Sequence, residues 1–369
     1  MTSRCIRALA LRVVYHVQQK LPHLHGQPTR TLVMMVTAFL AAGGPWLSEM
    51  GRKPADLPGA LQDKVKRLSR FLCRSEFDLA EAFESVAHVH PKRRIEVAMD
   101  WTDLGEYMGL LLSLPYQGRA LPLRCVVLPK ESALGSMTGE EEELLRSFLG
   151  LFPEEIRQRI VILADRGFGK RDLFVTIRNA DAHFAIRLSR ERHIRVQGTW
   201  TELAGLPLGP GQTLLLRGIE YTQEDPFRCH LAVRRLRPEE AHDPTDDTWY
   251  LATDLEEIES ALMKYSDRFQ IEEMFRDLKM RLNMDRHHLG TEASVGKMML
   301  IVTLAYLVVL EDGTQWRSRV DLARLQKSTA WGKLSVYSIA RACFEACLQE
   351  PPTPVGDLLV AAWTNRRAA

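Results

Sequence analysis

The sequence predicts an α/β protein in which helices flank a mixed sheet, with a helical region before the sheet and a β-rich insertion within it. Residues 1–90 carry helical patterns. From Arg93 onward strand patterns alternate with helical ones, as in folds with helices packed on a sheet. Residues 191–250 differ again, with short β-like runs between Gly, Pro and acidic residues. A chain of 369 residues is long enough for two or three domains.

The N-terminal region is predicted to contain helices over residues 4–20, 31–42 and 61–73. The third helix is basic, with Lys64, Lys66, Arg67, Arg70 and the following Arg74. A basic helix can contact DNA phosphates, or it can present a solvated face to water. The sequence leaves both interpretations open.

The sheet is predicted to begin with a strand over residues 94–100 and a hairpin made of strands 107–114 and 120–128. A helix over residues 139–151 follows. Its run of glutamates at residues 140–143 is expected on an acidic surface that offsets local basic regions, since the net charge is only +2. An apolar strand (159–165), a helix (170–179) and a further strand (183–189) complete this part, and the apolar strand is typical of the middle of a sheet.

Two of these strands are predicted to end in an aspartate, Asp100 in one case and Asp165 in the other. Ligands collect at the ends of strands in sheets of this kind. For either residue alone, the alternative is an ordinary turn or helix-capping aspartate.

The insertion is predicted to contain strands over residues 213–221 and 229–235, after which a strand over residues 249–253 returns the chain to the sheet. Asp254 is expected to cap the next helix. Buried helices are predicted over residues 298–310 and near residues 339–348.

Residues 265–279 are predicted to form one helix, because this stretch lacks Gly and Pro and is rich in helix formers. Its apolar row consists of Ile271, Phe275, Leu278 and Leu282. Tyr265, Arg268, Glu272 and Lys279 project within roughly 60° of one another on the adjoining face. A carboxylate can hold a divalent metal, and cations and a phenol suit phosphate oxygens. The alternative is a surface ion pair between Arg268 and Glu272.

Cysteine usage and hydropathy indicate a cytoplasmic protein. The six cysteines show no paired spacing that suggests zinc, and Cys343 and Cys347 are interpreted as core thiols on a helix. A reducing compartment is therefore expected. The apolar runs at residues 31–42 and 298–310 are too short for a confident membrane span.

These residues resemble the motifs of bacterial insertion-sequence transposases of the DDE superfamily. The branch with a Tyr-x2-Arg-x3-Glu-x6-Lys signature, the insertion-sequence-four family, has the spacing found at Tyr265, Arg268, Glu272 and Lys279. The segments Asp100-Trp-Thr and Asp165-Arg-Gly-Phe resemble that family's two aspartate motifs. The resemblance covers about residues 90–310. It implies a ribonuclease-H-like catalytic domain over residues 91–310, an N-terminal helical DNA-binding region (1–90) and a C-terminal helical region (311–369).

The resemblance also implies an activity. Asp100, Asp165 and Glu272 would hold two Mg²⁺ or Mn²⁺ ions about 3.5–4 Å apart for metal-dependent endonuclease cleavage and strand transfer. Tyr265, Arg268 and Lys279 would hold phosphates of the transposon end. Trp249 would stabilise a flipped base, the alternative being ordinary core packing.

In that case the protein is a cut-and-paste DNA transposase, an enzyme of DNA recombination. It would bind double-stranded DNA at terminal inverted repeats and join the ends to target DNA. It would act as a homodimer in the bacterial cytoplasm, associated with the nucleoid and not with a membrane. Two alternatives remain: a catalytically decayed DNA-binding relative, and a metal-dependent nuclease on the same fold.

Overall fold

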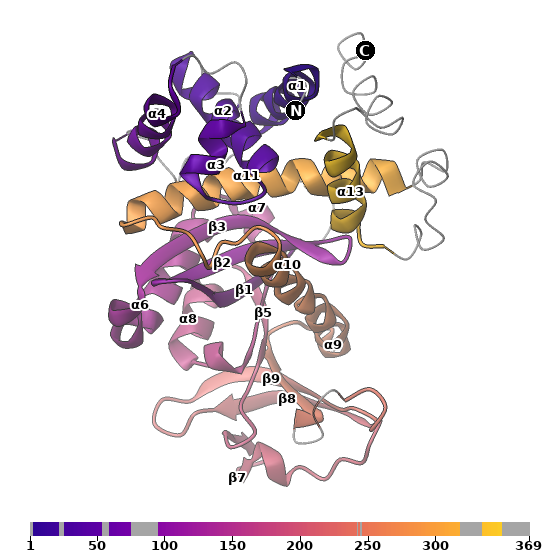
Figure 1. Cartoon of the computed structure of the whole chain (residues 1–369). Helices are drawn as coiled ribbons and strands as arrows, with labels where there is room; N and C mark the ends of the chain where they lie inside the picture. The colour runs from indigo at the N-terminus through magenta and orange to yellow at the C-terminus, as the bar shows by residue number, and fades with distance from the viewer. Residues whose placement is uncertain are drawn as a thin grey trace.

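A ten-stranded sheet with helices on both faces forms the centre of the protein in a computed structural model of the chain (Figure 1). The structure describes residues 3–21, 26–53, 59–74, 95–241, 243, 246–317 and 334–348. The side chains of Arg74 and Cys347 and most of the predicted C-terminal region lie outside the described residues.

One half of the sheet has the strand order β3-β2-β1-β4-β5. Its strands are β1 (Ile95–Leu104), β2 (Tyr107–Tyr116), β3 (Arg119–Pro129), β4 (Ile160–Ala164) and β5 (His183–Arg187). β4 is parallel to both β1 and β5, whereas β2 pairs antiparallel with β1 on one side and with β3 on the other. Every residue of β4 is buried, as its apolar sequence predicts. This mixed order is consistent with a ribonuclease-H-like fold.

The β-rich insertion extends the same sheet. Its strands are β6 (His193–Val196), β7 (Thr199–Glu202), β8 (Thr213–Tyr221), β9 (Phe227–Arg235) and β10 (Thr248–Thr253), with a 3-10 turn η2 (Leu203–Gly205) after β7. β10 pairs antiparallel with β5 on one side and with β9 on the other. The sheet therefore continues in the order β5-β10-β9-β8-β6-β7, and the insertion occupies one end of it (Figure 1).

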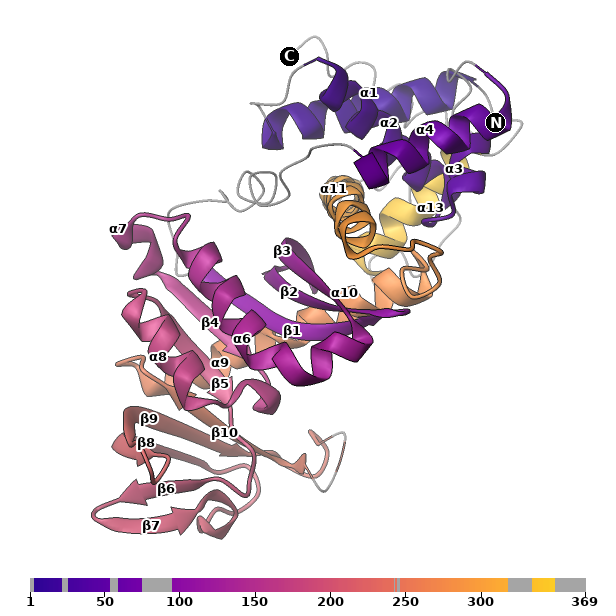
Figure 2. The ribbon, with the colours of Figure 1, turned by 90° about the vertical axis from the view of Figure 1, so that its left-hand side faces the viewer.

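Two pairs of helices cover opposite faces of the sheet (Figure 2). α6 (Lys130–Leu149) and α8 (Arg171–Asn179) lie on one face, and α9 (Ile258–Asp267) and α10 (Phe269–Met280) lie on the other. Short turns α7 (Glu154–Arg157) and η1 (Arg166–Phe168) flank β4. Because successive strand residues point to opposite faces, neighbouring residues of β1 contact different helix layers.

The four N-terminal helices are α1 (Ser3–Lys20), α2 (Gln27–Ala42), α3 (Leu47–Arg52) and α4 (Leu61–Arg74). Three of them, α1, α2 and α4, pack on the long helix α11 (Glu292–Arg317), which lies across β3, and α3 packs on α2 and α4 (Figure 1). α13 (Val336–Leu348) packs against α11 from the C-terminal side, where Gly313 lies next to the Val336 backbone. A buried ion pair joins Arg12 to Asp312. One apolar core thus includes helices from both ends of the chain, and the boundary predicted at residue 310 falls inside α11.

By length and composition α11 resembles a membrane span, but 94% of its most apolar window is buried inside the protein. The helix is longer than the predicted residues 298–310, so its length no longer argues against a membrane span. Its burial against other parts of the protein is the argument against one. Buried core helices meet the same criteria, so α11 is weak support for a membrane span.

Asp254 does not cap α9: its carboxylate accepts a hydrogen bond from the Phe184 backbone N–H (3.0 Å), because the chain turns back toward β5 before the helix begins. Cys343 is a buried free thiol, as predicted.

Candidate active site

The two predicted aspartates occupy adjacent positions on the parallel strands β1 and β4. The register pairs Met99 with Ala164, so Asp100 and Asp165 come next along their strands. Asp165 directly follows β4, as predicted. Asp100 does not end its strand: β1 continues to Leu104 because its outer edge pairs with β2, where Asp100 lies opposite Leu111.

Backbone N–H groups orient both carboxylates. Asp100 Oδ1 accepts a hydrogen bond from the Trp101 backbone N–H (2.8 Å). Asp165 caps the η1 turn and accepts one from the Gly167 N–H (2.8 Å). The capping alternative for Asp165 is therefore correct, and it leaves the second carboxylate oxygen for another partner.

The predicted single helix over residues 265–279 is two helices that meet at Arg268. Tyr265 belongs to α9, whereas Glu272 and Lys279 belong to α10. At the junction the Arg268 N–H donates to the Tyr265 carbonyl and the Ile271 N–H donates to the Arg268 carbonyl. These i,i+3 bonds tighten the turn and interrupt the α-helical pattern. The predicted apolar row of α10 is buried.

Arg268 joins the helix side of the site to the strand side. Its guanidinium lies 3.2 Å from Asp100 Oδ2 and 2.5 Å from Glu272 Oε1. The predicted ion pair between Arg268 and Glu272 therefore exists, but it is not a surface pair, because Arg268 is only 5% exposed. A buried cation held by two carboxylates has a larger electrostatic role than an exposed pair.

The carboxylates influence one another electrostatically. Burial raises the pKa of Asp100 to about 7, and Arg268 opposes this rise. The charges of Asp165 and Glu272 raise the pKa of Asp100 further. Asp100 and Glu272 thus share the Arg268 guanidinium, and Asp165 lies near enough to Asp100 to act on it electrostatically.

The carboxylates of Asp100, Asp165 and Glu272 are of the chemical type that binds hard divalent cations. All three side chains offer oxygen, the ligand type that Mg²⁺ and Mn²⁺ prefer, and a cation would oppose the burial and the carboxylate repulsion that together raise the pKa of Asp100. Among the described residues no three acidic, His or Cys side chains are close enough together to hold a metal ion. In this structure the Arg268 guanidinium supplies the positive charge between Asp100 and Glu272.

The remaining members of the predicted signature lie in different environments. Tyr265 is fully buried, and its ring contacts Trp249 edge-on at a centroid distance of 5.3 Å. The Tyr265 hydroxyl has no well-aligned hydrogen-bond partner in the described part of the chain. Lys279 is half-buried near Asp103, whose pKa it helps to lower. The break at Arg268 and the packing of α9 under β10 explain why Tyr265 does not share the exposure of Glu272.

Trp249 lies partly in the core and partly at the surface. One part of the side chain packs on the apolar cluster between β10 and α9. Another part lines an open pocket of about 620 Å³ together with Met263 and Phe269, whose side chains are exposed. Arg187 and Arg234 also line this pocket. A half-buried aromatic ring beside exposed apolar groups and arginines suits contact with a nucleobase.

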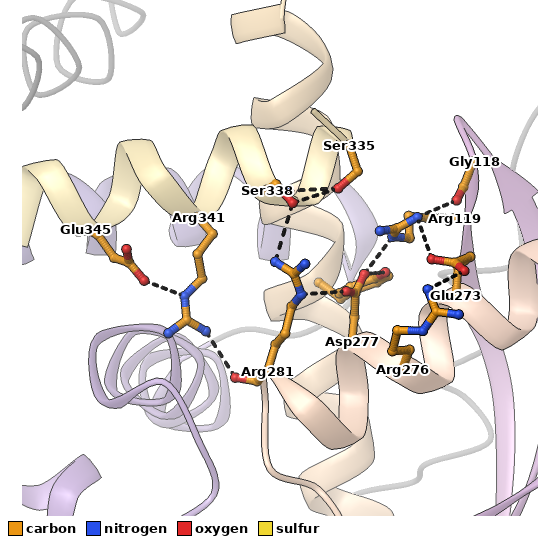
Figure 3. Close-up of polar contacts among 11 residues, drawn as sticks. Gly118, Arg119, Glu273, Arg276, Asp277, Arg281, Ser335, Ser338, Arg341 and Glu345 are labelled. Atoms are coloured by element: carbon orange, nitrogen blue, oxygen red, sulfur yellow. Dashed lines mark hydrogen bonds and ion pairs between the residues drawn. The ribbon is translucent and has the colours of Figure 1, made fainter. Parts of the chain in front are cut away.

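A buried carboxylate that the sequence analysis missed anchors α10. Asp277 is 1% exposed and accepts hydrogen bonds from Arg119 Nε on β3 (2.7 Å) and from the Tyr306 hydroxyl on α11 (2.8 Å). Arg281 Nε lies 3.1 Å from the other Asp277 oxygen and reaches Ser338 on α13 (Figure 3). The position of Asp277 beside Leu278 and Met274 on the buried face of the helix was the available signal.

The predicted acidic surface at residues 140–143 is wrong for one member. Glu141 is 1% exposed, because it lies on the face of α6 that also carries Leu144, Leu145 and Phe148. Its carboxylate accepts hydrogen bonds from Trp101 Nε1 (3.0 Å) and Lys170 Nζ (2.8 Å). The helical spacing of Glu141 relative to these apolar residues could have revealed its burial.

Comparison with known proteins agrees with this geometry. Residues 138–308 match the family model described as the transposase DDE domain. The matched range includes Asp165 and Glu272 and begins after Asp100. No curated protein matches the chain. The match supports a DDE transposase, a class that acts on DNA and generally uses divalent metal ions.

Proposed function

We propose that this protein is a cut-and-paste DNA transposase of the insertion-sequence-four branch. It would bind the terminal inverted repeats of its element, cleave them and join the ends to target DNA. The observation that carries the proposal is the contact of Arg268 with both Asp100 and Glu272, together with the strand register that places Asp165 beside Asp100. The family match and the Tyr-Arg-Glu-Lys spacing support the same proposal.

Asp100, Asp165 and Glu272 are the proposed ligands of two Mg²⁺ or Mn²⁺ ions. Bound metal would supply an activated water or 3′-hydroxyl and stabilise the leaving oxygen. The chain itself orients the site: the Trp101 and Gly167 N–H groups aim the two aspartates. Arg268 holds Asp100 and Glu272 near each other and brings positive charge to a scissile phosphate.

The proposed DNA contacts extend beyond the carboxylates. Lys279 would contact a phosphate directly, whereas the buried Tyr265 would act by supporting Arg268, which lies over its ring. Trp249 would stack on an unpaired base in the pocket that it lines with Phe269. In the N-terminal region, α4 exposes Lys66, Arg67 and Arg70 on the side opposite its buried Leu68, which suits contact with DNA phosphates. We also propose that the protein acts on DNA as a homodimer.

Cleavage and joining assays with DNA that carries the inverted repeats flanking the coding region test this proposal. Asp100→Asn, Asp165→Asn and Glu272→Gln should each abolish cleavage in Mg²⁺ while sparing binding of end DNA. Asp172→Asn on α8 and Glu273→Gln on α10 are matched controls. Cleavage by Glu272→Gln at a near wild-type rate would overturn the site assignment. Cleavage without joining of pre-cleaved ends would instead indicate a nuclease.

A further inference from the structure

We infer that Glu141 is a positioning residue that holds the two aspartate-bearing segments in their relative placement from the opposite face of the sheet. This inference rests on the proposed function of Asp100 and Asp165. Glu141 belongs to α6, whereas Arg268 and Glu272 approach the aspartates from the α9 and α10 face. It contacts neither aspartate, so its influence passes through Trp101 and Lys170.

Trp101 connects Glu141 to Asp100 directly. The Trp101 backbone N–H donates to Asp100 Oδ1 at 2.8 Å, and its indole Nε1–H donates to Glu141 Oε1 at 3.0 Å. Neighbouring strand residues point to opposite faces, so one residue serves both sides of the sheet. The hydrogen bond to Glu141 limits rotation of the Trp101 side chain and so helps to hold this residue, whose backbone amide aims the Asp100 carboxylate.

Lys170 connects Glu141 to the segment that follows Asp165. Lys170 Nζ lies 2.8 Å from Glu141 Oε2 and also donates to Thr138 Oγ1 at 3.0 Å. Between Asp165 and Lys170 the chain is held by the buried side chain of Phe168 and by the Tyr221 hydroxyl, which donates to the Gly169 carbonyl (2.7 Å). The short segment 165–170 therefore begins at Asp165 and ends at Lys170, whose side chain is bound to α6.

The two oxygens of one buried carboxylate thus bind one segment each. β1 and β4 stop pairing at Met99 and Ala164, so no ladder hydrogen bond joins these two strands beyond that point, although β1 continues to pair with β2. Asp100 and Asp165 lie immediately after it. Glu141 replaces the missing ladder with a charge-assisted bond to Lys170 and a second bond to Trp101. Because Glu141 is almost fully buried, removal of its carboxylate would take away the acceptor of the Trp101 indole N–H and the charged partner of Lys170, which would keep its hydrogen bond to Thr138.

The test measures Mn²⁺ binding by calorimetry, and kcat and KM for cleavage of end DNA, in the full chain. Glu141→Ala should weaken Mn²⁺ binding and lower kcat by about 10- to 100-fold, as seen for residues that orient metal ligands. KM for DNA should stay near the wild-type value, because Glu141 lies away from the proposed DNA surface. Glu141→Gln, which keeps an acceptor for Trp101, should recover part of the loss. Glu143→Gln is the matched control, since this neighbouring glutamate is 66% exposed on the same helix.

Trp101→Phe and Lys170→Met keep the inference testable if Glu141→Ala does not fold. Each removes one donor, and each should lower kcat and Mn²⁺ affinity by less than Glu141→Ala does. Combined with Glu141→Gln, each should show a loss smaller than the product of the single losses, because the groups act together. Folded variants with wild-type Mn²⁺ affinity and kcat would overturn the inference about Glu141. A wild-type chain that neither binds Mn²⁺ nor cleaves DNA would contradict the proposed function itself.

Discussion

On the strand side of the candidate site, Asp100 and Asp165 occupy adjacent positions of parallel strands, and backbone N–H groups aim both carboxylates. On the helix side, Glu272 belongs to a helix whose place depends on side-chain contacts, above all those of Asp277. Strand register is a local property of repeating hydrogen bonds. The position of α10 instead depends on Arg119, which is 158 residues from Asp277 in the sequence. The two sides should therefore respond differently to substitution.

The largest expected effect is on the helix side. Asp277→Ala leaves the buried Arg119 guanidinium without its main partner and should lower the free energy of unfolding by about 3–5 kcal/mol. Chemical denaturation of the full chain measures this change. Asp172→Ala removes an exposed carboxylate and should cost less than about 1 kcal/mol. Equal effects of the two substitutions would mean that the Asp277 network does not hold α10.

On the strand side, stability should depend on pH through Asp100. Its pKa rises to about 7 in the folded protein from 3.8, so the folded state holds this proton more tightly. The associated stability is fully present below about pH 4 and is lost as the pH rises through about 7. Asp100→Asn should therefore stabilise the metal-free protein at pH 8 relative to pH 5, by an amount on the order of a few kcal/mol. Thermal unfolding at both pH values measures the difference, and equal stabilisation at both would contradict a raised pKa.

Trp249 lies where the helix side meets the insertion, and its replacement separates two roles. If the ring supports an unpaired base, Trp249→Ala should remove about 1–3 kcal/mol of base stacking and slow hairpin formation or resolution more than the first nick. If packing is its main role, the substitution should cost about 3–5 kcal/mol of stability and slow every step together. Thermal stability measured beside nicking and hairpin rates decides between them, and uniform slowing in a destabilised protein would exclude the base-stacking role.

The smallest expected effect concerns Lys279. It has no carboxylate within ion-pair distance among the described residues, so Lys279→Ala should change stability little. Loss of one phosphate contact should reduce the steepness of the plot of log K for DNA binding against the logarithm of the salt concentration by about one. Arg268→Ala should change the same slope but also free Asp100 and Glu272 from their shared cation. An unchanged slope in Lys279→Ala would remove this residue from the DNA surface.

The sequence predicted the strand side better than the helix side for a physical reason. Apolar runs that lead to Asp100 and Asp165 are visible in local patterns, although β1 continues past Asp100 to Leu104. The break at Arg268 comes from i,i+3 bonds within a segment that has uniform helix-forming composition. The burial of Glu141 and Asp277 depends on partners far away in the chain, Trp101 and Arg119 among them. Local spacing places both carboxylates on buried helix faces, but it does not identify these distant partners.

Titration of the full chain with Mn²⁺ tests most directly whether the strand side and the helix side form one site. Asp100→Asn, Asp165→Asn and Glu272→Gln should each weaken binding by at least about tenfold. Asp172→Asn and Glu273→Gln should bind Mn²⁺ as the wild type does. Loss of binding in the two aspartate variants together with wild-type affinity in Glu272→Gln would contradict a single site made of all three carboxylates.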